Sequence, residues 1–331
     1  MSRIVLHIGP HKTGTTYIQT RLHENREALR SVGVDYCSAG LDAGFAHHKV
    51  ADVARSGDEA ALAALLEPLA ASDAELLILS SENFDLLRAP GVRRLQTALP
   101  AARAVSVVYF LRDATELLLS SWQEHVKHGG VLGFHEYANP HLTAPFASPL
   151  LNPCRVLDGY RSAFGAEAIR VVDYDAARAV GDIFDAFAIA CDAPGLTRFG
   201  TPLRANITME LWFAEFMRAL NAAAQEAGVL RYANVRQTLL RLRKSDAGMQ
   251  VLLAEAQRRI SACMRPFSLR GSEVERSARR ALSAYPRIAL PDADNVEKSF
   301  RERGAPCDQW LCSTEGHALL AEAFRKVRAT L

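Results

Sequence analysis

The chain has 331 residues, of which 49% are hydrophobic and 23% are charged, a composition typical of a globular protein with room for one large domain or two modest ones. Its 39 Lys and Arg residues nearly balance its 37 Asp and Glu residues, so the formal net charge of +2 gives no reason to expect nucleic acid or a membrane surface as a partner. No stretch reaches the roughly 18 consecutive apolar residues of a membrane-spanning helix.

The first residues run straight into a strand-like segment, without the apolar stretch and cleavage site of a secretory signal peptide. The sequence therefore predicts a cytoplasmic protein. Its six cysteines are scattered without a C-x-x-C pair, which is typical of reduced thiols. Cys307 and Cys312 are the pair for which a disulfide or a shared metal would be considered first, although free thiols are the expected state.

The N-terminal half alternates short apolar runs with helical patterns, which predicts a parallel α/β sheet flanked by helices. Continuous apolar runs such as that of residues 104–111 suit strands that are covered on both faces. Strands are predicted at Ile4–Ile8, Leu76–Leu79, Val105–Leu111 and Ile169–Val172. Helices are predicted around them at Thr15–Leu29, Asp58–Ala71 and Thr115–His128.

The C-terminal part is predicted to be mainly helical. Residues 130–155 are rich in Pro, Gly, Asn and His and predict a long loop, either a substrate-side rim or a plain surface excursion. Amphipathic helices are predicted beyond it at Met209–Ala224, Val235–Leu242, Gln250–Met264, Glu273–Ala284 and Thr314–Arg328. We expect a single domain over 1–331, with an α/β core at 1–190, a helical cap or insertion at 191–290, and a C-terminal segment and helix at 291–331.

The strongest local signal is the segment Leu6–Thr16, in which a predicted strand meets a predicted helix through a loop bounded by Gly9 and Gly14. A helix N-terminus reached in this way presents backbone N–H groups and a partial positive charge to an anion. The glycines allow the close approach that a phosphate requires. We expect the anion to contact a run of six residues, namely His11, Lys12, Thr13, Gly14, Thr15 and Thr16.

The spacing of this loop resembles the P-loop G-x-x-x-x-G-K-[ST], but its lysine is displaced. Thr15 follows Gly14 where the P-loop has lysine, and Lys12 stands inside the loop instead. A P-loop lysine reaches the β and γ phosphates of ATP beside a Mg²⁺ ion. The displacement therefore disfavours a kinase or another ATP-dependent phosphotransferase, which remains the alternative reading.

The sequence H-I-G-P-H-K-T-G-T-T of residues 7–16 resembles the 5′-phosphosulfate loop of sulfotransferases, particularly of the bacterial and carbohydrate-type branches. The resemblance implies a P-loop-like fold and 3′-phosphoadenosine 5′-phosphosulfate (PAPS) as the sulfuryl donor. It also implies adenosine 3′,5′-bisphosphate (PAP) as the product. By the same resemblance Lys12 contacts the sulfate and its bridging oxygen. No metal is expected, because side chains and loop amides can neutralise the donor.

A second anion site is predicted where the third strand ends, at Arg112. Ligands bind at the carboxyl ends of strands in open parallel sheets. Ser120 follows about two helical turns later, roughly 10 Å along the helix. Arg112 and Ser120 match the phosphate-contacting positions of the sulfotransferase 3′-phosphate motif R-[DN]-P-x-x-R-x-x-S-x-Y. Ala114, Leu117 and Trp122 depart from that motif, at its Pro, its second Arg and its Tyr.

A general base that takes the proton of the acceptor is the remaining requirement of sulfuryl transfer. Glu82 follows the second predicted strand and should lie on the same sheet edge as Lys12 and Arg112. Related bacterial and carbohydrate sulfotransferases have an acidic residue there in that role, although a glutamate at a helix start also has a structural explanation. The histidine candidates for the base are His11, His47, His48 and His125, with His47 slightly preferred.

Three functions are thus considered. A PAPS-dependent sulfotransferase acting on a small-molecule or carbohydrate acceptor fits both motifs best. A nucleotide-dependent kinase would need ATP and Mg²⁺, and a non-catalytic nucleotide-binding protein would bind the bisphosphate without turnover. The identity of the acceptor and the oligomeric state do not follow from the sequence, because the donor site does not determine the acceptor.

Overall fold

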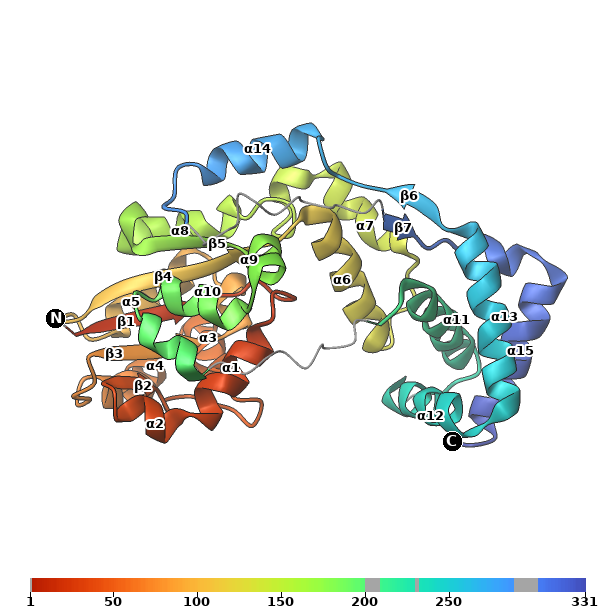
Figure 1. The fold of residues 1–331 in the computed structure, drawn as a ribbon, viewed down its shortest axis with the longest axis horizontal. Coiled ribbons are helices and arrows are strands. Elements are labelled where there is room, and N and C mark those ends of the chain that lie inside the picture. Colours follow the sequence, from red (N-terminus) through yellow and green to blue (C-terminus); the bar gives the residue numbers. More distant parts are fainter. Residues whose placement is uncertain (1, 200–208, 230–231, 289–302) are drawn as a thin grey trace. The chain divides into compact units, whose positions relative to one another are not determined.

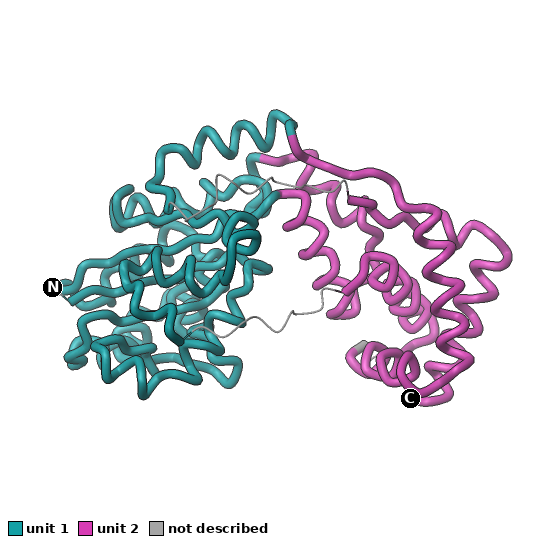
Figure 2. The backbone as a smooth tube through the Cα atoms, viewed as in Figure 1, with its two compact units in different colours: residues 1–113, 146–204, 271–299 teal, residues 114–145, 205–270, 300–331 magenta. Residues whose placement is uncertain are grey.

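The computed structural model describes residues 2–199, 209–229, 232–288 and 303–331 of the chain (Figure 1). The chain divides into two compact units, each assembled from three separate stretches (Figure 2). Unit 1 comprises residues 1–113, 146–204 and 271–299, and unit 2 comprises residues 114–145, 205–270 and 300–331. The three expected segments stay a prediction, and the boundary expected near residue 290 lies outside the described residues.

Among the described residues of unit 1, five parallel strands form one sheet in the order β2-β3-β1-β4-β5. These strands are β1 Arg3–His7, β2 Val34–Tyr36, β3 Leu76–Ser80, β4 Ala104–Leu111 and β5 Ile169–Asp173. In the central register His7 pairs with Ser80 on one side and with Val108 on the other. The carboxyl ends of β1 and β3 therefore lie side by side, and the chain leaves both strands at the same edge.

Helices cover both faces of this sheet, as the continuous apolar runs of its strands require (Figure 1). Alternate residues of β1 divide between the faces, with Ile4 and Leu6 in one core and Val5 in the other. The first face is covered by α3 His48–Ser56, α4 Glu59–Leu66, α5 Ala89–Ala98, α8 Cys154–Phe164 and the end of α14 Glu273–Leu282. The second face is covered by α1 Thr15–Glu24, α2 Arg26–Arg30, α9 Tyr174–Val180 and α10 Ile183–Ala190.

Unit 2 is mainly helical within the described residues, with one short antiparallel pair of strands. Its elements are α6 Ala114–Lys127, α7 Phe134–Thr143, α11 Leu211–Glu226, α12 Tyr232–Ser245, α13 Ala247–Cys263, α15 Thr314–Arg328, β6 Arg265–Phe267 and β7 Arg303–Ala305. A buried ion pair lies at its centre, where both guanidinium contacts of Arg218 to Glu215 are 2.6–2.8 Å long. The Trp310 indole N–H also donates to Glu215 at 3.2 Å, so the buried carboxylate has several donors.

The predicted fold class, a parallel α/β sheet flanked by helices with a mainly helical C-terminal part, is confirmed. The four predicted strands are β1, β3, β4 and β5. The fifth strand, β2, has only three residues and gave no periodic signal. The helix predicted over residues 15–29 is divided at Asn25, whose side chain donates to the Arg21 carbonyl at 2.8 Å and caps the first part.

The loop predicted over residues 130–155 is wrong for its central part, which forms α7. The Gly133 N–H donates to the Glu136 carboxylate at 2.8 Å, and this contact caps the helix start. Phe134 is then buried against the rings of Trp122 and Phe267, with centroids 5.9 and 5.0 Å away. Long-range burial thus outweighs the helix-breaking composition of the segment. None of the described helices combines the length and apolarity needed to cross a bilayer.

Candidate functional site

The loop between β1 and α1 is held at both ends by main-chain and side-chain hydrogen bonds. At its start, Ile8 donates its N–H to Val108 at 3.0 Å, and Phe110 donates to the Gly9 carbonyl at 3.1 Å. Further along, the buried Thr13 hydroxyl donates to the Pro10 carbonyl at 2.7 Å. The Thr13 hydroxyl, one of the predicted anion contacts, is therefore engaged in closing the loop on itself.

The backbone of this loop takes a positive φ three times, at Gly9 with a φ of 89°, at Lys12 with 68° and at Gly14 with 76°. A residue other than glycine is uncommon there, and it is found most often where function requires it. A side chain at Gly14 would place its Cβ 2.2 Å from Cδ1 of Ile183, so α10 closes against the bare backbone. The glycine is thus required by both conformation and space.

The start of α1 leaves backbone amides for a ligand. The first hydrogen bonds that the helix makes within itself run from Tyr17 and Ile18 to the Gly14 carbonyl, at 3.0 and 3.2 Å. The amides of Thr15 and Thr16 have no hydrogen-bond acceptor within the helix, and both lie at the positive end of the helix dipole. Thr16 is exposed, whereas Thr15 is buried. Backbone amides beside a partly exposed lysine are groups suited to an anion, and the predicted anion cradle at this loop stays a prediction.

Arg112, which follows β4 directly, reaches the same loop. Its Nη1 donates to the carbonyl oxygen of Lys12 at 2.6 Å, and its guanidinium carbon lies 5.3 Å from the centre of the Tyr174 ring. The exposed Arg178 of α9 lies 5.8 Å from the same ring. Two guanidinium groups therefore flank Tyr174 at the carboxyl ends of β4 and β5. Arg178 was not predicted, because its only sequence signal is an arginine shortly after a strand.

Glu82 lies against the start of the loop, as predicted from its place after β3. It begins the short helix η2 Glu82–Leu86, and a Cβ on Gly9 would lie only 3.2 Å from its Cα. Its Oε2 accepts a hydrogen bond of 3.0 Å from Gln19 of α1. Burial acts to raise the pKa of Glu82, but the Gln19 hydrogen bond, its own backbone N–H and two nearby histidines outweigh burial and lower it. Glu82 is therefore a carboxylate at neutral pH.

His48, rather than the slightly preferred His47, faces this carboxylate. Its Nε2 lies 3.8 Å from Oε1 of Glu82 and 4.0 Å from Oδ2 of Asp42, and its Nδ1 lies 2.7 Å from the Ser81 hydroxyl. The other oxygen of Asp42 accepts the N–H groups of Gly44 and Ala46 at 2.8 and 3.0 Å. The imidazole is thus held between two carboxylates at a partly exposed position.

His47 is fully buried and bonded to the main chain on both sides. Its Nδ1 accepts the Ser80 N–H at 3.0 Å, so Nε2 carries the proton and donates to the Cys37 carbonyl at 2.9 Å. Burial lowers the pKa of His47 to about 4. A neutral imidazole therefore joins the end of β3 to the segment after β2, and this arrangement favours a structural role.

Asp85 also supports the loop and was not predicted. Its carboxylate accepts the backbone N–H of His11, while its Oδ1 is buried without a hydrogen-bond partner in the described part of the chain. Burial, reinforced by the nearby Glu82 charge, raises the pKa of Asp85 to about 7. The buried Asp85 carboxylate gave no sequence signal, because its burial depends on the packing of η2 against the sheet.

Two predicted residues, Ser120 and His125, belong to unit 2 and lie on α6. Ser120 is 8% exposed. The His125 ring lies 5.4 Å from the Tyr137 ring, and burial lowers the pKa of His125. Their expected contributions to phosphate binding and to proton transfer stay predictions.

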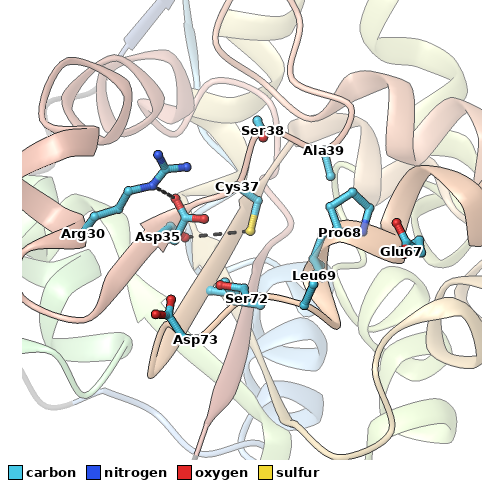
Figure 3. Close-up of a pocket in the computed structure, with 12 residues that line it drawn as sticks. Arg30, Asp35, Cys37, Ser38, Ala39, Glu67, Pro68, Leu69, Ser72 and Asp73 are labelled. Carbon is cyan, nitrogen blue, oxygen red and sulfur yellow. Dashed lines mark hydrogen bonds and ion pairs between the residues drawn. The ribbon is translucent and has the colours of Figure 1, made fainter.

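A pocket of about 600 Å³ lies at the β2 edge of unit 1 (Figure 3). Arg30 and Asp35 form an ion pair of 2.9 Å in its wall, and Cys37 lies beside them. Burial raises the pKa of the Cys37 thiol to about 12, so this sulfur is not a nucleophile at neutral pH. The described lining includes none of the predicted site residues, and the pocket is separate from the anion cradle.

No three His, Cys, Asp or Glu side chains gather into a metal-binding group among the described residues.

In comparisons with known proteins, neither a family model nor a curated protein matches the chain. A solved structure titled as a sulfotransferase from Alicyclobacillus acidocaldarius is similar to it at 16% identity, with a TM-score of 0.39. The similarity covers 70% of this chain and 97% of that one.

Proposed function

We propose that this protein is a sulfotransferase that takes the sulfuryl group of PAPS and transfers it to a hydroxyl or amine of a small-molecule or carbohydrate acceptor. The observation that carries the proposal is the loop at Gly9–Thr16. Its lysine stands inside the loop in a left-handed conformation, and Arg112 of the neighbouring strand binds the lysine carbonyl. The resemblance of residues 7–16 to a phosphosulfate loop supports the same donor.

The residues around the cradle suit an anionic donor that carries a phosphosulfate and a separate phosphate. Lys12 and the amides of Thr15 and Thr16 would hold its 5′ end, where Lys12 neutralises the charge that develops as the sulfuryl group leaves. Arg112 would bind the 3′-phosphate, as the sequence motif predicts. The fit of the loop rests on Gly9 and Gly14, since a Cβ at either position would crowd Glu82 or Ile183.

Glu82 is assigned as the base that takes the acceptor proton. Its pKa is held low by Gln19 and by the histidines near it, so it is ionised and available at neutral pH. Gln19 also holds the carboxylate in place through its 3.0 Å contact to Oε2. His48, 3.8 Å from Oε1, favours the ionised form of this carboxylate. The buried His47 keeps both nitrogens on the main chain and is not assigned to this step.

The test is titration of the purified protein with PAP and with ATP·Mg²⁺, followed by thermal shift and calorimetry. We expect PAP to bind and Lys12→Ala to weaken it at least tenfold, or about 1.4 kcal/mol. Lys49→Ala, which removes an exposed lysine from α3, is the matched control and should bind normally. Binding of ATP·Mg²⁺ without binding of PAP would contradict the proposal.

Transfer is then measured with ³⁵S-labelled PAPS and a panel of hydroxylated and amino acceptors. Label that moves to an acceptor supports the enzyme, and Glu82→Gln should reduce its rate. Tight PAP binding without transfer to any acceptor would favour a nucleotide-binding protein instead.

A further inference from the structure

Cys263 and Cys307 are brought together in unit 2 although 44 residues separate them in the sequence. Cys263 is the last residue of α13, while Cys307 and Cys312 flank and end the short helix η7 Asp308–Cys312. The Cys307 sulfur lies 3.0 Å from the carbonyl oxygen of Cys263. The other three cysteines, Cys37, Cys154 and Cys191, are buried.

The strand pair β6–β7 explains why Cys263 and Cys307 meet. The strands are antiparallel, and Arg265 is paired with Ala305. Cys263 lies two residues before Arg265 and Cys307 two residues after Ala305, so the register carries the two cysteines to opposite positions just beyond the ladder. The 3.0 Å contact between the Cys307 sulfur and the Cys263 carbonyl oxygen shows that the two residues are neighbours, as the roughly 4.4–6.8 Å Cα separation of a disulfide requires.

The surroundings allow a reagent to reach this pair. Cys263 and Cys307 are partly exposed and Cys312 is exposed, in contrast to the buried cysteines of unit 1. Burial, together with the neighbouring thiols of Cys307 and Cys312, raises the pKa of Cys263.

We propose that Cys263 and Cys307 form an intramolecular disulfide when the protein meets a low-molecular-weight disulfide such as oxidised glutathione. One thiolate attacks the glutathione disulfide and releases one glutathione thiol, which leaves a mixed disulfide on the protein. The second cysteine then attacks the protein-bound sulfur and releases the second glutathione. The protein loses two thiol protons and two electrons, and one molecule of oxidised glutathione becomes two thiols.

The new bond would tie the end of α13 to the segment that leads into η7 and α15. It would also close a covalent ring over residues 263–307, which include the stretch 271–299 that the chain contributes to unit 1. Closing a long loop restricts the unfolded chain more than the folded one, so oxidation stabilises the protein. The pair lies in unit 2, and its oxidation does not depend on the proposed activity.

Peptide mapping of the oxidised full-length protein tests the proposal. Trypsin does not cleave the Arg265–Pro266 bond, so Cys263 is released on the peptide of residues 260–270. Cys307 and Cys312 share one tryptic peptide, but cleavage before Asp308 with endoproteinase Asp-N separates them. After incubation with oxidised glutathione, we expect peptide 260–270 to be joined to peptide 304–307, and the link to disappear with dithiothreitol.

Three serine variants and a thermal melt complete the experiment. Cys312→Ser should form the same link, whereas Cys263→Ser and Cys307→Ser should not. Oxidation should raise the Tm of the wild-type protein and of Cys312→Ser by about 5 °C, with no rise in the other two. A link from Cys312 to either partner, glutathione retained on Cys263 or Cys307, or free thiols throughout would each overturn the proposal.

Discussion

The guanidinium of Arg112 donates a hydrogen bond to the carbonyl oxygen of Lys12, 2.6 Å away and 100 residues earlier in the chain. The arginine expected at one anion site is therefore also a support of the other. Because this carbonyl belongs to a residue in the left-handed region, the contact stabilises a backbone conformation that lysine adopts reluctantly. Under the proposed function, the 5′-phosphosulfate and the 3′-phosphate of PAPS would thus be recognised by residues that hold each other in place.

Arg112→Ala is expected to weaken PAP binding by more than the loss of one phosphate contact, on the order of 10- to 100-fold, or about 1.4–2.8 kcal/mol. Arg112→Lys retains the positive charge but replaces the planar guanidinium with a single ammonium group. Its affinity for PAP should therefore lie between those of the wild type and Arg112→Ala. Isothermal titration calorimetry measures all three, with the exposed arginine variant Arg55→Ala as control. Equal affinities of wild type and Arg112→Ala would show that the arginine does not serve the cradle.

Gly14→Ala should damage the cradle without touching any charged group. The φ of 76° costs an alanine about 1–2 kcal/mol, and its Cβ would meet Ile183. We expect a lower Tm and at least tenfold weaker PAP binding. Gly195→Ala, whose Cβ would meet nothing within 4 Å, is the matched control. A Gly14→Ala protein with normal PAP affinity would contradict the assignment of the loop.

Glu82→Gln should separate transfer from binding. The amide cannot accept the acceptor proton, so the rate of sulfuryl transfer should fall by roughly 10²- to 10⁴-fold. The Kd for PAP should stay within about threefold, because Gln can keep a contact with Gln19. Single-turnover transfer and calorimetry are the measurements, with Glu59→Gln on the exposed start of α4 as control. A small rate change would move the base to His48.

His47 should make the protein less stable as the pH falls from about 6.5 to about 4. Its folded pKa of about 4 lies below the unfolded value of 6.5, so the unfolded chain binds a proton that the folded chain does not. Urea unfolding measures how far the free energy of unfolding falls between pH 7 and pH 5. We expect this fall to be about 2 kcal/mol smaller in His47→Gln than in the wild-type protein. Identical decreases in both proteins would mean that His47 is accessible to protons when folded.

Asp85 should make the protein less stable as the pH rises, which is opposite to the effect of His47. Its folded pKa of about 7 lies above the unfolded value of 3.8, so the folded protein binds the extra proton and its stability falls as the pH rises from about 4 to about 7. Asp85→Asn keeps an acceptor for the His11 N–H but cannot ionise. As the pH rises from 5 to 8, the free energy of unfolding of the variant should increase by about 2 kcal/mol relative to that of the wild type, as measured by urea unfolding. An unchanged difference at the two pH values would indicate that Asp85 is ionised throughout.

Much of the fold and the location of the cradle followed from local patterns. The strands β1, β3, β4 and β5 are short segments rich in apolar residues, and such segments report burial wherever they occur. The displaced Lys12 and the two glycines are visible in a stretch of eight residues, since a strand–loop–helix turn is made by neighbours in sequence. Glu82 was predicted beside this loop because parallel strands end at one edge.

Only the tertiary structure decided two kinds of contact. One kind joins residues that are distant in sequence, and the other distinguishes adjacent side chains that point in different directions. The sequence cannot say which of His47 and His48 faces Glu82, because both belong to one turn and only the packing of β3 buries the first. It also cannot show that Arg112 holds Lys12, that Asp85 holds His11, or that Cys307 lies against Cys263. The amino-acid sequence by itself determined the strand–loop–helix turn at Gly9–Thr16 and the sheet around it, since both arise from local conformation and burial. The contacts that tune the cradle arise from chain packing, which brings together groups up to 100 residues apart.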